Sequence, residues 1–290
     1  MTLSRRTFLK GTAAGVAGAA LMSDLAAHLA SAAPAAGIHV GARQDCFGGS
    51  FEAAKRCGLD GVEIGVGRPA EKLHIADPAV REKFKKDVRA TGVVVSSLSM
   101  DLLNGNPMAT DPQAPAWLEQ TIEAAKDLGA AGILVPFFGK AHLLAGKEFK
   151  KPETDALVER MKAAAPKAKD AGVSLGIECT LSARQYLELL DRIASDAVGA
   201  YCDIGNSTGA GLDVPADIRD LKGRLTMLHF KDGGNYLGEG KVKMEPIAEA
   251  LKAIDYKGWI VLETSCPSKN AEADGKRNTD FVKKLMCLSA

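Results

Sequence analysis

The sequence carries almost no net charge. Its 37 lysine and arginine residues are balanced by 36 aspartate and glutamate residues, so the formal charge is +1 over 290 residues. Proteins that bind nucleic acid through its phosphates need a clear excess of positive charge. We therefore expect no nucleic-acid partner. Hydrophobic residues at 46% and charged residues at 25% are typical of a globular protein with a sizeable core.

Cysteines are few, and long apolar runs are missing. Six cysteines in a chain of this length do not make a disulfide scaffold. Beyond residue 32 no apolar run approaches the roughly 18 residues that cross a bilayer, so we expect no membrane span there. The first predicted strand lacks a glycine-rich phosphate turn after it, and no linker rich in proline or serine divides the chain. A dinucleotide-binding open sheet is therefore the weaker alternative.

The N-terminus has the features of an export signal. Arg5 and Arg6 precede Thr-Phe-Leu-Lys, an Ala- and Gly-rich stretch over 11–29, and a small-residue cleavage motif at 30–32. The paired arginines resemble a twin-arginine signal, which implies the twin-arginine translocation machinery as a partner. The sequence therefore predicts a periplasmic or otherwise exported protein.

Two segments follow from this signal. We predict a signal peptide over 1–32 and one domain over 33–290, with a net charge of −1 after cleavage. A retained membrane anchor is the alternative, which the charged Asp24 and the polar His28 disfavour. The oligomeric state is left open.

Short β-branched runs alternate with helical patterns along the mature chain. Parallel strands need connections of this kind, so the alternation predicts β/α units. Eight units in a chain of this length predict a closed (β/α)8 TIM barrel of the α/β class, with a doubly wound open sheet as the alternative. The predicted strands are 38–41, 61–65, 93–100, 132–137, 173–179, 200–204, 225–230 and 259–264, and the clearest helices are 77–91, 116–128, 155–171, 183–195 and 245–254. The segment 141–154 is either a lid over the active end or a solvated loop.

Four successive strands end in residues that bind metals. In a parallel barrel the carboxyl-terminal strand ends meet at one mouth, so these side chains would surround a common point. Three carboxylates there would repel one another without a cation. Oxygen ligands with one imidazole suit Mn²⁺, Mg²⁺, Co²⁺ or Zn²⁺, and a six-coordinate ion would leave two positions for substrate oxygens. We predict one divalent metal ion, held by Glu178, Asp203, His229 and Glu263.

Four motifs carry a family resemblance. They are Gly-Val-Glu-Ile at 61–64, His-Phe-Lys-Asp at 229–232, Leu-Gly-Glu-Gly at 237–240 and Gly-Trp-Ile-Val-Leu-Glu at 258–263. Together with the strand-end carboxylates, they resemble the sugar phosphate isomerase/epimerase superfamily of xylose-isomerase-like barrels. The resemblance covers nearly all of the mature chain.

The resemblance implies an isomerase or epimerase acting on a sugar, a keto-sugar or a related polyol ketone. Glu178 and Glu263 would be the catalytic acid and base on opposite faces of the substrate, with the ion stabilising an enediolate. A reading in which both glutamates are only ligands stays open. So do a lyase of the inosose or 3-keto-glycoside type and a non-catalytic sugar-binding barrel. A trinuclear zinc endonuclease is disfavoured, because only four histidines remain after residue 32.

Substrate contacts are predicted outside the metal ligands. Asn206 stands where ketose 3-epimerases of this family have a histidine, and Asp-Gly-Gly-Asn at 232–235 stands where they have an arginine. These departures resemble the hydroxypyruvate isomerase and inosose dehydratase or isomerase branches. Lys231 alternates with His229, so it is predicted either to point inward to a substrate oxygen or to form an outward salt bridge. The predicted substrate-binding residues are Glu63, His142, Asn206, Lys231 and Asp232, with the last also a candidate to support the metal ligands.

Cys46 and Cys266 follow the first and eighth predicted strands. A closed barrel makes these strands neighbours and places both thiols at the same end. Two alternatives remain for this pair, a disulfide formed in an oxidising compartment or two separate thiols.

Replacing both Arg5 and Arg6 by lysine tests the export prediction. The double variant should leave precursor in the cytoplasm, because the paired arginines are the recognised feature of the signal. Cell fractionation with antibody detection measures the distribution. A single exchange at Lys10 to arginine is the control, and efficient export of the double variant would contradict the prediction.

Overall fold

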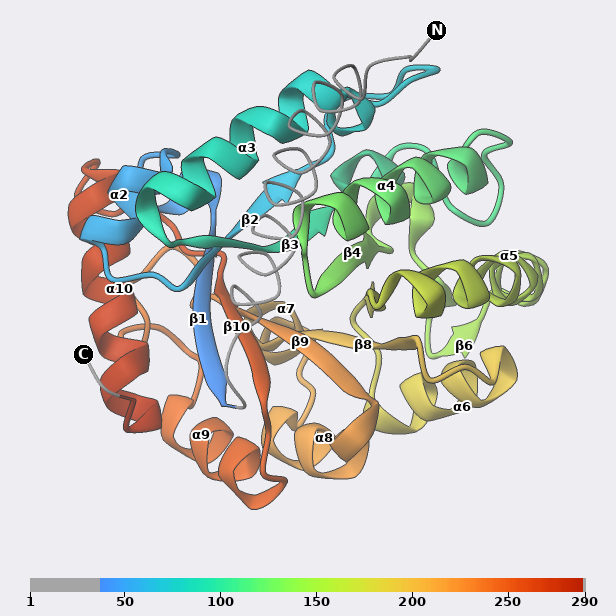
Figure 1. Cartoon of the computed structure of the whole chain (residues 1–290). Helices are drawn as coiled ribbons and strands as arrows, with labels where there is room; N and C mark the ends of the chain where they lie inside the picture. Colours follow the sequence, from blue (N-terminus) through green and yellow to red (C-terminus); the bar gives the residue numbers. More distant parts are fainter. Residues whose placement is uncertain (1–36, 289–290) are drawn as a thin grey trace, which may run out of the picture. The chain divides into compact units, whose positions relative to one another are not determined.

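The computed structural model describes residues 37–288, which form a closed barrel of eight parallel strands. Around the barrel the order is β1-β10-β9-β8-β7-β4-β3-β2 (Figure 1). The first and last strands pair, with Ile38 opposite Gly258, so the sheet has no open edge. The strands are β1 (Ile38–Arg43), β2 (Gly61–Gly65), β3 (Val94–Ser99), β4 (Gly132–Pro136), β7 (Ser174–Glu178), β8 (Val198–Asp203), β9 (Leu225–Phe230) and β10 (Gly258–Leu262). The predicted TIM barrel is confirmed, and the open-sheet alternative is wrong.

Helices cover the outside of the barrel (Figure 1). They are α2 (Phe51–Arg56), α3 (Pro78–Thr91), α4 (Ala114–Leu128), α5 (Lys151–Ala171), α6 (Ala183–Ile193), α7 (Ile204–Gly209), α8 (Val214–Leu221), α9 (Met244–Ala253) and α10 (Ala271–Met286). The helix α5 begins four residues earlier than predicted, with Pro152 in its first turn, where proline is favoured. Among the described residues no helix has the length and apolarity of a membrane span. The predicted signal peptide over 1–32 lies outside the described part.

The segment predicted as a lid or a loop contains a short hairpin. Its strands β5 (Leu144–Ala145) and β6 (Glu148–Phe149) are antiparallel. The Gln185 side chain of α6 donates to the Lys147 carbonyl at 2.9 Å, and Lys150 Nζ donates to the His142 carbonyl at 2.8 Å. The first bond ties the hairpin to α6, and the second lies within the segment. Closure over the site stays a prediction.

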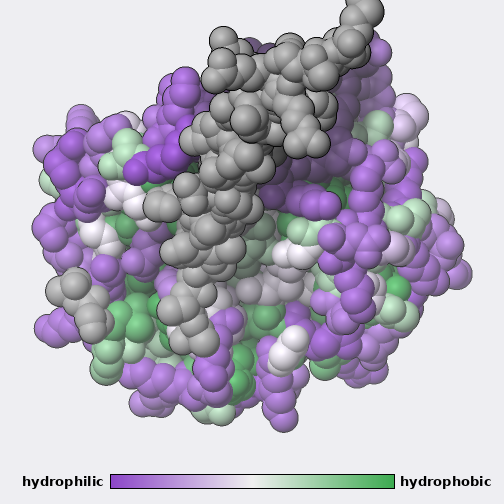
Figure 2. Space-filling view, viewed as in Figure 1, coloured by the Kyte–Doolittle hydropathy of each residue, from purple (hydrophilic) through white to green (hydrophobic). Residues whose placement is uncertain are grey.

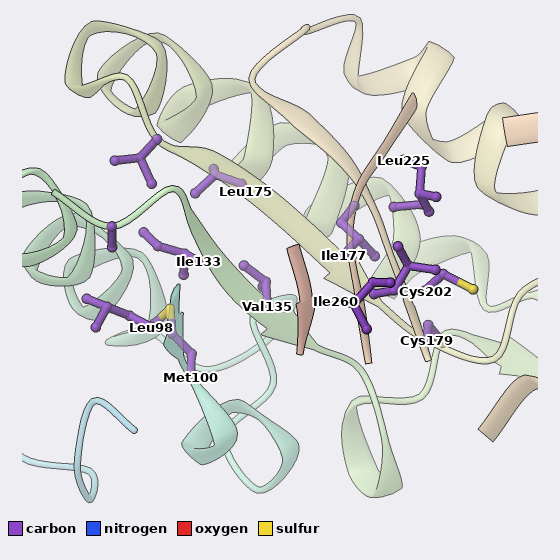
Figure 3. Packing of buried hydrophobic residues seen from close by; sticks show 14 of the residues in the cluster. Leu98, Met100, Ile133, Val135, Leu175, Ile177, Cys179, Cys202, Leu225 and Ile260 are labelled. Carbon is purple, nitrogen blue, oxygen red and sulfur yellow. The ribbon is translucent and has the colours of Figure 1, made fainter. Parts of the chain in front are cut away.

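Alternation along the strands separates two apolar regions. Residues such as Ile133, Val135, Leu175 and Ile177 point outward and pack under the helices (Figure 3). A smaller cluster fills the barrel interior and consists of Leu134, Tyr201, Met227, Trp259 and Val261. Figure 2 shows hydrophilic residues widely spread over the outer surface of the described part. The apolar residues therefore leave the inward positions near the strand ends for polar groups.

Glycines make room for the large interior side chains. A Cβ atom on Gly61 would lie 2.6 Å from the Trp259 ring, and one on Gly176 would lie 2.8 Å from the Tyr201 ring. Neither contact is possible without movement of a packed aromatic ring. Small residues on one strand and aromatic residues on another therefore fill the interior together.

Gly61→Ala should destabilise the barrel by about 1–3 kcal/mol, since the added methyl group overpacks the interior against Trp259. Gly65→Ala is the matched control in the same strand, because a Cβ atom there meets nothing within 4 Å. Urea unfolding of both variants measures the difference. Equal stability of the two variants would argue against the close packing.

Candidate metal centre

The pleat of the strands brings the four predicted ligands to one face. Glu178 ends β7, Asp203 ends β8, His229 is the second-last residue of β9, and Glu263 directly follows β10. Asp203 pairs in register with His229, which itself pairs with Val261, two residues before Glu263. Residues two apart on a strand share a face, so all four side chains point into the mouth of the barrel. Their ligand atoms lie within 4.8 Å of one another.

His229 lies at the centre of this group. Its Nδ1 atom is 3.0 Å from Glu178 Oε1 and 3.2 Å from Glu263 Oε2. Its Nε2 atom is 3.0 Å from Oε1 of Glu63. The imidazole is completely buried, whereas the Glu263 side chain keeps 29% of its surface exposed. Solvent and small molecules therefore reach the group from the Glu263 side.

The geometry of the group fits a divalent ion. Opposite ligands of an octahedral ion with bonds of about 2.0–2.1 Å lie about 4.2 Å apart, within the observed spread of donor atoms. The buried Asp203 Oδ2 atom accepts no hydrogen bond from any described residue. This oxygen faces Lys231 Nζ at 2.8 Å, and a buried carboxylate without a hydrogen bond is unfavourable, so it is available to coordinate a cation. Three carboxylates and one imidazole thus form a possible metal site that can take the predicted ion.

The first turn of α7 uses only the Oδ1 atom of Asp203. Asp203 caps the helix, since its Oδ1 accepts the backbone N–H of Asn206 at 2.8 Å. The other oxygen, Oδ2, then turns toward the centre. The structure thus places the Asn206 backbone beside a metal ligand, and a substrate contact by its side chain stays a prediction.

Lys231 points inward. Its Nζ atom is 2.8 Å from Glu263 Oε2 and 2.8 Å from Asp203 Oδ2, although only the first contact has hydrogen-bond geometry. A side chain on Gly205 would collide with Lys231, so glycine in α7 lets this lysine reach the site. The inward direction is therefore correct, and the outward salt bridge is wrong. Contact of Lys231 with a substrate oxygen stays a prediction.

The two candidate catalytic glutamates have opposite electrostatic surroundings. Burial raises the pKa of Glu178 to about 7, although the charge of His229 opposes this shift. At Glu263 burial also favours the neutral form, but the hydrogen bond and charge of His229 and the charge of Lys231 outweigh it and lower the pKa. Pairs of titratable groups whose surroundings shift their pKa values in opposite directions are typical of acid and base partners.

Two charged residues at the mouth were missed from the sequence. Arg43 Nη1 lies 3.7 Å from Glu63 Oε1 and 3.8 Å from Glu263 Oε1. Asp101 holds the guanidinium with contacts of 2.7 and 3.3 Å. The first strand was predicted to stop at Gly41, but it continues to Arg43. Extending the alternation of that strand by two residues would have placed the arginine inside.

Glu63 and Asp232 are both buried and fully engaged. Glu63 bonds to His229 below the mouth, and its side chain is only 1% exposed, so no free face for a substrate is apparent. The Asp232 carboxylate accepts the backbone N–H groups of Gly238, Gly240 and Val242 at 2.8–3.2 Å. It therefore organises the loop after β9. These three bonds do not involve the candidate metal ligands. The predicted substrate contact of Asp232 stays a prediction.

His142 lies away from the four ligands. Its Nε2 atom is 3.2 Å from Thr180 Oγ1, and the ring borders a cavity of about 950 Å³ between the hairpin and α6. Thr180 is two residues beyond Glu178, so the cavity starts at most about 7 Å along the chain from a metal ligand. A substrate contact by His142 thus stays a prediction.

The cysteines are separate thiols. Cys46 and Cys266 are both free, and the Cys46 sulfur accepts the backbone N–H of Thr264 at 3.2 Å. Burial raises the pKa of the Cys46 thiol to about 12, so it stays protonated. The disulfide alternative is therefore wrong, although the two strands are neighbours as expected.

Fold and site together define a class, that of TIM-barrel proteins with a possible four-ligand metal centre at the carboxyl-terminal mouth. Residues 51–285 match the family described as xylose isomerase-like TIM barrel. The chain belongs to this family. Residues 2–22 match the twin-arginine translocation signal sequence, which confirms the resemblance found at the N-terminus.

Curated relatives of the chain are epimerases. The chain is 25% identical over 261 residues to an L-ribulose-5-phosphate 3-epimerase of Salmonella paratyphi A, covering 83% of this chain and 90% of the relative. It is 25% identical over 193 residues to a ketose 3-epimerase of Arthrobacter globiformis, covering 62% and 66%.

Solved structures share the fold. An L-ribulose 3-epimerase superposes with a TM-score of 0.72 at 19% identity, covering 86% of this chain and 94% of that chain. A D-allulose 3-epimerase from Methylomonas sp. in complex with D-allulose superposes with a TM-score of 0.70 at 18% identity, covering 86% and 98%.

Purified protein should contain about one divalent ion per chain, and Asp203→Ala should lower this content, because the change removes a buried carboxylate oxygen that accepts no hydrogen bond. Elemental analysis after gel filtration measures the content. Asp191→Ala is the control, since that carboxylate is exposed and pairs with Arg224 on the surface. Unchanged metal content in the Asp203 variant would exclude this residue as a ligand.

Proposed function

We propose that the protein is a divalent-metal-dependent epimerase or isomerase that moves a proton next to the carbonyl of a keto-sugar. The observation that carries the proposal is the joint position of Glu178 and Glu263 at His229, with ligand atoms close enough for one ion. Two carboxylates beside one substrate carbon can remove a proton from one face and return one to the other. That exchange inverts the carbon centre.

The electrostatic difference between the glutamates supports their roles. Glu263, whose pKa is lowered, is the ionised group and accepts the substrate proton. Glu178, whose pKa is raised, holds the proton that is delivered to the opposite face. A dication bound through His229 would lower the pKa of both groups and leave the imidazole neutral. The exposure of Glu263 and its contact with Lys231 therefore support its role as the base. In the reverse direction the two groups exchange roles.

Positive charge around Glu263 supports binding of the substrate oxygens. A divalent ion held by the four ligands supplies Lewis-acid polarisation of the carbonyl. Lys231 and Arg43 lie on two sides of the Glu263 carboxylate, 2.8 and 3.8 Å away. Both carry hydrogen-bond donors that can hold substrate hydroxyl groups near this base.

The names of the relatives favour epimerisation. The curated proteins and solved structures described above are 3-epimerases of ketoses or ketose phosphates. This agreement outweighs the likeness of Asn206 and of residues 232–235 to the hydroxypyruvate isomerase and inosose branches. Inversion at a carbon beside the carbonyl of a ketose is therefore the first reaction to test.

The export signal favours an unphosphorylated substrate. The signal at residues 2–22 implies passage through the twin-arginine pathway, and we propose a periplasmic or other exported location. Phosphorylated sugars are scarce outside the cytoplasm. A free ketose or keto-glycoside is therefore the proposed substrate class.

Exchange with heavy water tests the proposal. Mature protein loaded with Mn²⁺ is incubated with D-fructose, D-allulose or a 3-keto-glycoside in D₂O, and the products are followed by NMR. Deuterium at one carbon of an intact skeleton supports an epimerase or isomerase. Loss of a substituent would establish the lyase alternative, and binding without exchange would leave the sugar-binding barrel.

Glu263→Gln separates a base from a ligand in the same assay. The amide keeps an oxygen for weak coordination but cannot accept a proton, so turnover should fall at least about a hundredfold while part of the metal stays bound. Glu239→Gln is the control, because this exposed glutamate pairs with Arg277 on a surface loop. A fall of activity in strict proportion to metal content would mean that Glu263 is only a ligand.

A further inference from the structure

Glu63 is a buried carboxylate in the barrel interior, on the side of His229 away from the candidate metal ligands. Both of its oxygen atoms are engaged. Oε1 is 3.0 Å from His229 Nε2, whereas Oε2 accepts the Ser97 hydroxyl at 2.7 Å and the Tyr201 hydroxyl at 2.9 Å. The partners come from β3, β8 and β9, so three separate strands converge on this one side chain in β2.

The two nitrogen atoms of His229 face different groups. Nδ1 faces Glu178 and Glu263, and Nε2 faces Glu63. An imidazole that binds an ion through Nδ1 keeps its hydrogen on Nε2. Because His229 is completely buried, that hydrogen needs an acceptor within the protein. Glu63 is the acceptor in place.

We infer that Glu63 is a positioning residue that accepts the Nε2–H of His229 and thereby presents Nδ1 to the divalent ion. The inference rests on the metal site of the proposed function. It assigns Glu63 a role at the histidine in place of the predicted contact with substrate. A carboxylate behind a metal-binding histidine fixes the ring orientation and makes the nitrogen a better electron donor.

Packing alone gives no reason for a carboxylate at this position. Other interior positions hold large apolar side chains such as Trp259 and Met227. The Ser97 and Tyr201 hydroxyls that bond to Glu63 could bond equally to a neutral acceptor, so they do not require its charge. The Arg43 guanidinium lies 3.7 Å from Glu63 and offsets its charge. The carboxylate and its counterion therefore lie directly beside a candidate metal ligand.

Metal affinity of the metal-free protein tests the inference without relying on turnover. Titration with Mn²⁺ in a calorimeter compares the wild type with Glu63→Gln and Glu63→Leu. The glutamine variant keeps an acceptor but loses the charge, and its affinity should fall about 10- to 100-fold. The leucine variant keeps neither and should bind more weakly still. Denaturant unfolding shows which variants are folded. If Glu63→Leu does not fold, the affinity of Glu63→Gln alone tests the inference.

Tyr201→Phe is the matched control. It removes a bond to Oε2 of Glu63 but keeps the bond between Oε1 and His229, as well as the ring that packs edge-on against the imidazole at 4.7 Å. The affinity of this variant for Mn²⁺ should change by less than about threefold, because the hydrogen bond that is lost is neutral and touches neither His229 nor the ion.

Three results would overturn the inference. Folded Glu63 variants that bind Mn²⁺ within about threefold of the wild type would show that the carboxylate does not support His229. Equal losses in Tyr201→Phe and Glu63→Gln would show that general packing is responsible. A wild type that binds no divalent ion would instead overturn the proposed metal site itself, which separates the failure of the proposed function from that of this inference.

Discussion

The site depends on one shared contact, that of three carboxylates with the imidazole of His229. Glu178 and Glu263 approach one nitrogen and Glu63 approaches the other, all at 3.0–3.2 Å. Carboxylates gathered around one side chain repel one another, so the arrangement requires positive charge between and around them. Lys231 and the guanidinium of Arg43 supply part of it. A divalent ion would supply the rest.

The residues that pack the barrel interior and the candidate metal ligands lie at different positions along the same strands. Toward the interior, Trp259 and Tyr201 pack against strands whose glycines leave room for their rings. Two residues beyond Tyr201, β8 ends at the buried Asp203, and four residues beyond Trp259 the chain reaches Glu263. Moving the register of a strand by one residue would exchange inward and outward faces and remove a ligand. The close apolar packing therefore holds the ligands at their positions.

The four candidate ligands differ in how exposed their side chains are. Glu263 is the most open of the four and lies between two cationic side chains, which suits the group that meets the substrate first. Asp203 is buried and held by the first turn of α7, which suits a fixed ligand. The loop after β9 is organised by Asp232, whose carboxylate accepts the backbone N–H groups of Gly240 and Val242.

The sequence alone was sufficient to predict the barrel and to group the four candidate ligands, because both predictions depend on local periodicity. Apolar alternation predicts strands, and parallel strands bring their carboxyl ends together, so Glu178, Asp203, His229 and Glu263 could be grouped without coordinates. The paired arginines likewise predicted the N-terminal signal, and residues 2–22 match the twin-arginine signal sequence. In each case the relevant pattern lies within a few consecutive residues.

Only the tertiary structure decided which groups face one another across the barrel. Glu63 is 166 positions from His229 in sequence, and no local pattern indicates their bond. Asp232 adjoins the site in sequence but turns to the backbone of its own loop. Arg43 reaches the mouth because β1 is two residues longer than its apolar pattern. Such contacts depend on strand length, register and closure of the sheet, and these are settled only when all eight strands pack together.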